Sequence, residues 1–125
     1  MIEATALPAA WQVRFRAGDN EGVADTVKNG VGGSSGMRPH ELLEAALATC
    51  MTISARMALA DLGVAHGEAS VRVRVHLERE GSATRFRYEL ALDPALEPHR
   101  PTVMERVERS PVRATLTKQL IFEHV

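Results

Sequence analysis

Residues 39–62 constrain the fold of this chain most, because a helix drawn through them is apolar on nearly every side. Between Ala45 and Ala60 most positions are apolar or small. Pro39 suits the first turn of a helix and Gly63 suits its C-terminal stop. A helix of roughly 24 residues is about 36 Å long at ~1.5 Å per residue, which is more than twice the ~14 Å radius of gyration expected for such a chain. Helices that are apolar all round are buried, so this one needs cover that a single small sheet does not supply.

The other segments predict antiparallel strands. Apolar and polar residues alternate over 11–16, and after a turn residues 22–27 are expected to pair back as a hairpin. The glycine-serine stretch 29–36 predicts a flexible loop leading into the helix, because it lacks the lysine of a phosphate-binding loop. Alternation over 71–77 and 86–92 predicts a longer hairpin with one dry face and one charged, solvated face.

The C-terminal third predicts short helices. Thr102 is a candidate N-cap for a helix ending near Arg109. Ser110-Pro111 then interrupts the chain before a further helix over 112–120, and residues 121–125 suggest a last short strand. The order of strands, long helix, strands and short helices predicts an α+β fold with antiparallel sheet. At 125 residues, the chain is expected to form a single domain over 1–125.

Composition narrows the partners. The net charge of −1 and the scattered basic residues give no reason to expect nucleic acid or an anionic membrane as a partner. Neither a signal peptide nor a membrane span is expected, because charged and polar residues interrupt the best apolar run. One cysteine excludes an internal disulfide or a multi-cysteine metal site, and the histidines show no ligand spacing. The sequence therefore predicts no metal, no cofactor and a cytoplasmic location.

Three motifs occur together along the chain. A glycine-rich segment leads into Pro-His-Glu-Leu-Leu at 39–43, Ala-Ala-Leu-Ala-Thr-Cys occupies 45–50, and Ser-Pro-Val-Arg-Ala-Thr-Leu occupies 110–116. From about Gly32 to the C-terminus the chain resembles the OsmC/Ohr family of osmotically inducible and organic hydroperoxide resistance proteins. The resemblance implies an OsmC-like intertwined homodimer, in which antiparallel sheets from both chains wrap two long central helices.

The resemblance also implies thiol-based peroxide reduction in oxidative-stress defence. Cys50, the only cysteine, takes the position of the family's peroxidatic cysteine, and Ser110 takes that of its resolving cysteine. A hydroxyl cannot form a disulfide, so an active protein would use Cys50 with an external thiol reductant. A hydroperoxide is the implied substrate.

In the family an arginine held by a glutamate activates the cysteine. His40 stands where the family's glutamate directly follows the proline, and Glu41 is one residue further on. The candidate arginines are Arg14, Arg16 and Arg38.

The residues leave other interpretations open. Cys50 also fits a simple core cysteine, His40 a surface position at the start of a helix, and Ser110 an N-cap. Three hypotheses follow: a one-cysteine thiol peroxidase, a non-catalytic dimer that binds a small organic ligand in its interface cavity, and a purely structural dimer.

Overall fold

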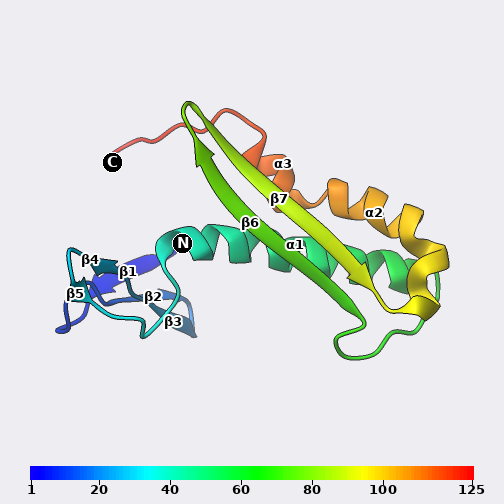
Figure 1. The fold of residues 1–125 in the computed structure, drawn as a ribbon, viewed down its shortest axis with the longest axis horizontal. Helices are drawn as coiled ribbons and strands as arrows, with labels where there is room; N and C mark the ends of the chain where they lie inside the picture. The colour runs from blue at the N-terminus through cyan, green and yellow to red at the C-terminus, as the bar shows by residue number, and fades with distance from the viewer. The chain divides into compact units, whose positions relative to one another are not determined.

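The computed structural model describes residues 1–125, which form two units, Met1–Leu43 and Glu44–Val125. Both contain antiparallel strands, and a long helix, α1 (Pro39–Asp61), begins in the first unit and continues in the second (Figure 1). The predicted α+β class with antiparallel sheet is confirmed.

A three-stranded sheet forms most of the first unit. Its strands are β1 (Glu3–Ala6), β2 (Val13–Ala17) and β3 (Asn20–Ala24), in that order and antiparallel. A two-residue hairpin of β4 (Val27–Lys28) and β5 (Val31–Gly32) follows. The predicted hairpin is confirmed, since Phe15 lies opposite Gly22, but its second strand runs over Asn20–Ala24 instead of the expected 22–27.

Two other boundaries in this unit also differ from the prediction. The strand expected over 11–16 begins at Val13, because Trp11 has a φ of 65°, which a strand does not allow. The stretch 29–36, expected to be loop throughout, contains the short strand β5. At its end, Gly36 approaches the chain so closely that an added Cβ would collide with the Val23 carbonyl oxygen.

Asp25 organises this loop although its side chain is almost fully buried, at 1 % exposure. Its carboxylate oxygens accept the Thr26 N–H at 2.8 Å and the Ser35 N–H at 3.0 Å. The Ser35 hydroxyl in turn accepts from Gln12 Nε2 at 2.9 Å. The hydrogen bond from the Ser35 amide makes the largest contribution to lowering the pKa of Asp25, and the Thr26 amide adds to it. Burial acts in the opposite direction, but the pKa stays below its ordinary value. Polar contacts therefore order the loop that precedes α1.

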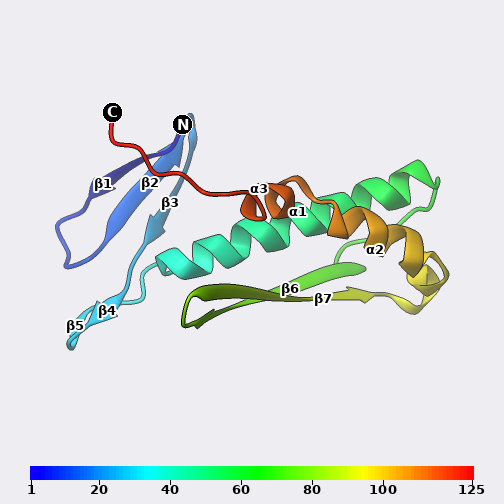
Figure 2. The same ribbon diagram turned by 90° about the horizontal axis from the view of Figure 1, so that it is seen from above.

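The second unit has two layers. One is the hairpin of β6 (Val71–Glu80) and β7 (Ala83–Leu92), as predicted, with Val75 opposite Tyr88. The other contains α1 and α2 (Arg100–Glu108), with the hairpin packed along the helices (Figure 2). The helix α1 ends as expected before Gly63, which has a φ of 68°.

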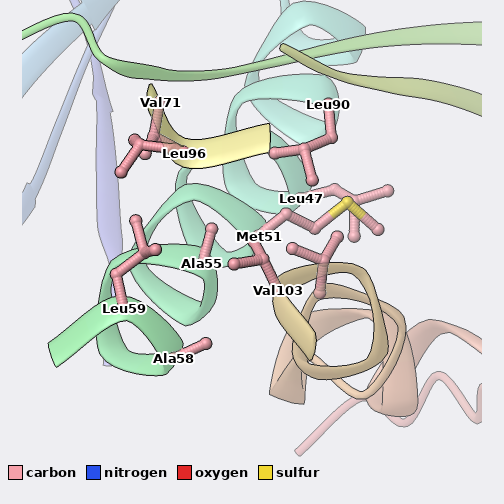
Figure 3. Close-up of a cluster of buried hydrophobic side chains, with 10 residues drawn as sticks. Leu47, Met51, Ala55, Ala58, Leu59, Val71, Leu90, Leu96 and Val103 are labelled. Atoms are coloured by element: carbon pink, nitrogen blue, oxygen red, sulfur yellow. The ribbon is translucent and has the colours of Figure 1, made fainter. Parts of the chain in front are cut away.

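The hydrophobic core lies where α1, the hairpin and α2 meet (Figure 3). Met51 and Leu59 of α1 are completely buried, as is Val103 of α2. Leu90 reaches the same cluster from β7. One side of α1 is thus covered within the chain.

Another side of α1 is not covered. Ile53 is 51 % exposed and Met57 52 % exposed, and Leu43 is also exposed. By length and composition alone α1 is apolar enough to cross a membrane, a test that the core helix of a soluble protein also passes. Within the most apolar 18-residue stretch of this helix, only 33 % is buried within the chain. The expectation that one small sheet leaves this helix partly bare is confirmed.

The C-terminal third corrects three predictions. Thr102 is not an N-cap, because a 3₁₀ helix, η1 (Pro94–His99), runs directly into α2 at Arg100. The last helix, α3 (Pro111–Leu116), is shorter than the expected 112–120. Residues 121–125 form no strand, since no neighbouring strand pairs with them, and Ile121 and Phe122 are exposed.

Candidate functional site

Cys50 contacts the segment that begins at Ser110. The Val112 N–H donates to Cys50 Sγ at an N···S distance of 3.5 Å, across 62 residues of sequence. Cys50 lies on α1 beside the buried Met51, and Val112 lies in the first turn of α3. The structure therefore brings two of the three sequence motifs together within one chain.

Cys50 is half-buried and not disulfide-bonded. Its neighbour Met51 points into the core with 0 % exposure. The cysteine thus lies at the edge of the core, and its sulfur contacts a backbone donor.

Ser110 occupies the N-cap position of α3, with extended backbone angles of φ −58° and ψ 140°. Its hydroxyl nevertheless makes no capping hydrogen bond. An N-cap oxygen ordinarily accepts the N–H of the second or third helical residue. Here the second residue is Val112, and its N–H is directed at Cys50 Sγ instead. The cysteine sulfur takes the place of the serine cap.

The Ser110 hydroxyl is therefore left without a partner. The residue is 0 % exposed, and its Oγ is a fully buried side-chain oxygen that has no hydrogen bond. Buried polar atoms in proteins are nearly always paired, so an unpaired one at a candidate site needs a physical explanation.

The first unit holds an arginine–glutamate pair. Arg38 Nε lies 2.8 Å from Glu41 Oε1, and the Arg38 N–H donates to the same oxygen at 3.0 Å. The Arg38 side chain, followed by its amide, holds the pKa of Glu41 below its ordinary value. Glu41 is therefore ionised at neutral pH and holds the Arg38 side chain; the part that either residue plays in activating Cys50 stays a prediction.

The other candidates in this unit are exposed. His40 lies in the first turn of α1, and Arg14 lies on β2. Arg16 is 3.8 Å from Glu3 across the sheet, a loose surface pair. Their catalytic roles stay predictions.

Each unit contains a pocket with charged residues in its lining. A pocket of about 460 Å³ in the second unit is lined by Thr52, Arg56 and His66, with Arg56 Nε donating to His66 Nε2 at 3.2 Å. A smaller one in the first unit, of about 290 Å³, includes Arg38 and Glu41. Neither is lined by Cys50 or Ser110.

Sequence reasoning missed the backbone donor of Val112. A backbone N–H leaves no mark in the side-chain pattern. The one signal that could have identified it is its place two residues after Ser110. The reasoning also missed Asp25, whose role depends on contacts with a loop ten residues away.

Comparisons with known proteins agree with the sequence motifs. The family model for OsmC-like proteins matches residues 32–124. A search of curated protein sequences finds no match. Among solved structures, an OsmC-like protein from Mycoplasma pneumoniae has a TM-score of 0.69 at 14% identity, covering 93% of this chain and 85% of that one. An organic hydroperoxide resistance protein from Vibrio cholerae, with captopril bound in one of its active sites, has a TM-score of 0.64 at 19% identity, covering 94% and 84%. These likenesses establish a common fold.

Proposed function

Because this chain belongs to the OsmC-like protein family, we propose that it is a one-cysteine hydroperoxide reductase. Cys50 is the reacting residue, and an external thiol is its reductant. The proposal assigns the protein to defence against organic hydroperoxides, in keeping with relatives of the same fold named as organic hydroperoxide resistance proteins.

The contact between Cys50 and Val112 carries the proposal. The Val112 N–H, two residues after the Ser110 position, supplies a backbone hydrogen-bond donor at the sulfur of the chain's only cysteine. Cys50 is only partly buried, so the residue is not sealed inside the core. A cysteine that merely filled the core would need neither feature.

The reaction balances with one cysteine. The Cys50 thiolate attacks the terminal oxygen of a hydroperoxide, an S–O bond forms as the O–O bond breaks, and the alkoxide takes a proton to leave as an alcohol. The sulfenic acid then reacts with an external thiol, which gives a mixed disulfide and water. A second thiol releases Cys50 and leaves as a disulfide. Each turnover thus reduces one hydroperoxide and oxidises two thiols.

Within the first unit, Arg38 and Glu41 are the pair that we assign, from the resemblance, to the family's arginine held by a glutamate. Glu41 lies one residue beyond the family's glutamate position and contacts the guanidinium at 2.8 Å. His40 directly follows the proline at the exposed start of α1. It is the second candidate, after Glu41, for the residue that holds the arginine.

The proposed assembly is a homodimer that covers the bare side of α1. The exposed apolar residues Ile53 and Met57, one turn apart on α1, supply the surface. Monomeric proteins seldom leave contiguous apolar surface of this kind uncovered.

The test measures hydroperoxide consumption with cumene hydroperoxide and a small thiol, for the unchanged protein and for Cys50→Ser. The unchanged protein is expected to turn over slowly and to fade, because without a resolving cysteine Cys50 over-oxidises to the sulfinic acid. Mass spectrometry should find first one and then two oxygens on Cys50. Loss of hydroperoxide at equal rates in both proteins would overturn the proposal.

Ser110→Cys tests the same mechanism from the other side. The new thiol should condense with the Cys50 sulfenic acid, give an internal disulfide and raise turnover with a dithiol. A variant that folds yet forms no disulfide after hydroperoxide treatment would contradict the assignment of Ser110 to the resolving position.

The second candidate function is binding of a small organic ligand without catalysis. It is favoured by the Vibrio cholerae relative, whose active site holds captopril. Under this alternative Cys50→Ser would keep the ligand affinity, measured by calorimetry with captopril, and neither protein would consume hydroperoxide.

A further inference from the structure

Ser110 has a buried hydroxyl that the reduced protein does not use. The residue is 0 % exposed and its Oγ has no partner. An alanine at this position would remove the cost of leaving that hydroxyl unpaired. The backbone would lose little, because the hydroxyl does not cap α3.

The position of this hydroxyl links it to the reacting sulfur. Ser110 precedes by two residues the Val112 N–H that contacts Cys50 Sγ at 3.5 Å. The hydroxyl thus belongs to the same turn of chain that meets the sulfur, but the thiol sulfur is not its hydrogen-bond partner. An oxygen added to the sulfur would bring a second hydrogen-bonding group to this turn of chain, where the Ser110 hydroxyl has no partner.

We propose that Ser110 holds the oxygen that a hydroperoxide leaves on Cys50. This inference rests on the proposed function. When the O–O bond breaks, Cys50 keeps one oxygen as a sulfenic acid and the sulfur is oxidised by two electrons. The new S–OH both donates and accepts hydrogen bonds, as the Ser110 hydroxyl does. Ser110 and Val112 together then satisfy the oxidised side chain.

The chemistry of a one-cysteine mechanism gives this contact a purpose. A resolving cysteine would trap the sulfenic acid at once as a disulfide. Without one, the sulfenic acid must persist until an external thiol arrives, and a second hydroperoxide would convert it irreversibly to the sulfinic acid. Serine at position 110 stabilises the intermediate in place of trapping it.

The experiment follows the lifetime of the Cys50 sulfenic acid in the full chain. The reduced protein receives one equivalent of cumene hydroperoxide, and a sulfenic-acid-specific dione is added after increasing delays. Mass spectrometry then measures the labelled fraction. We expect Ser110→Ala to shorten the lifetime about tenfold, as the loss of one hydrogen bond to a reactive group implies, with the rate of first oxidation little changed.

Thr115→Ala is the matched control, since it removes an exposed hydroxyl from the same helix. It should leave the lifetime unchanged. A second readout separates a structural role from the proposed one: Ser110→Ala should keep or raise the Tm of the reduced protein but lower the Tm of the oxidised protein relative to the unchanged chain.

The outcomes separate the two proposals. Equal lifetimes in Ser110→Ala and the unchanged protein would overturn the role of Ser110 and leave Cys50 as the reacting residue. A lower Tm of Ser110→Ala in both redox states, with no change in lifetime, would mean a structural serine. If Cys50 of the unchanged protein gains no oxygen, the proposed function itself fails, and this inference fails with it.

Discussion

Different kinds of contact stabilise the interior of each of the two units. In residues 44–125 a hydrophobic cluster buries Met51, Leu59 and Val103 completely. In residues 1–43 only Ala24 and Asp25 are buried, and the loop before α1 is ordered by hydrogen bonds to one carboxylate. The second unit contains a core of its own, whereas the first has almost none.

This difference shows which parts of the chain have too few buried apolar contacts. A small sheet with few buried apolar residues is marginal by itself. The second unit, although it has a core, leaves Ile53 and Met57 of α1 exposed. A second copy of the chain, as proposed above, would bury additional apolar surface in the first unit and would also cover the exposed side of α1. The following predictions test each side of this comparison.

The largest effect is expected from Met51→Ala in the core of the second unit. Removing a fully buried methionine side chain costs about 2–5 kcal/mol of unfolding free energy. Urea denaturation of both proteins measures the loss. Met57→Ala is the matched variant on the bare side of the same helix. If its cost equals that of Met51→Ala at the lowest protein concentration measured, where a dimer contributes least, the two sides of α1 do not differ as the structure indicates.

Ile53→Asp tests the proposed cover. A carboxylate in a dry contact between two chains is strongly unfavourable, so assembly should weaken about a hundredfold or more. Sedimentation measures the assembly. Arg72→Asp on the exposed side of β6 places the same charge in water and should leave assembly unchanged. A stable, well-folded monomer of the unchanged protein would refute the proposed dimer.

Asp25→Asn tests the polar contacts of the first unit. The amide nitrogen of asparagine cannot accept a hydrogen bond, so the contact with Thr26 or Ser35 is lost. Hydrogen exchange in residues 26–36 should become faster, with the core of α2 unaffected. Asp19→Asn in the exposed turn before β3 is the control. Unchanged exchange would mean that the carboxylate does not order the loop.

Acid should weaken the first unit by the same route. The pKa of Asp25 is lowered by its amide donors from the ordinary value of 3.8, so folding favours the charged form. Its contribution to stability is complete above 3.8 and is lost as the pH falls through the lowered folded pKa. The protection factor of the Ser35 amide, which is its exchange rate relative to the intrinsic rate at each pH, should therefore fall in acid, and Asp25→Asn should flatten this dependence. An identical acid profile in both proteins would assign the effect to another carboxyl.

The sequence alone determined the local structure of this protein. The proline start and glycine stop of α1, the alternation of β6 and β7 and the incomplete cover of the helix are properties of short stretches, and all are present in the structure. Predictions failed where a neighbour decides the outcome. Thr102 lost its role because η1 continues into α2, and residues 121–125 form no strand because no strand lies beside them.

Both the sequence motifs and the tertiary structure were needed to identify the candidate site. Motifs in the sequence identified Cys50 and Ser110, and their spacing pointed to the family. Only the tertiary structure decided that the Val112 N–H turns to the sulfur and that the Ser110 hydroxyl is buried without a partner. Side-chain pattern encodes helices and strands because those depend on residues a few positions apart. A hydrogen bond between a side chain and a backbone group 62 residues away depends on how the two helices pack, and no local pattern records it.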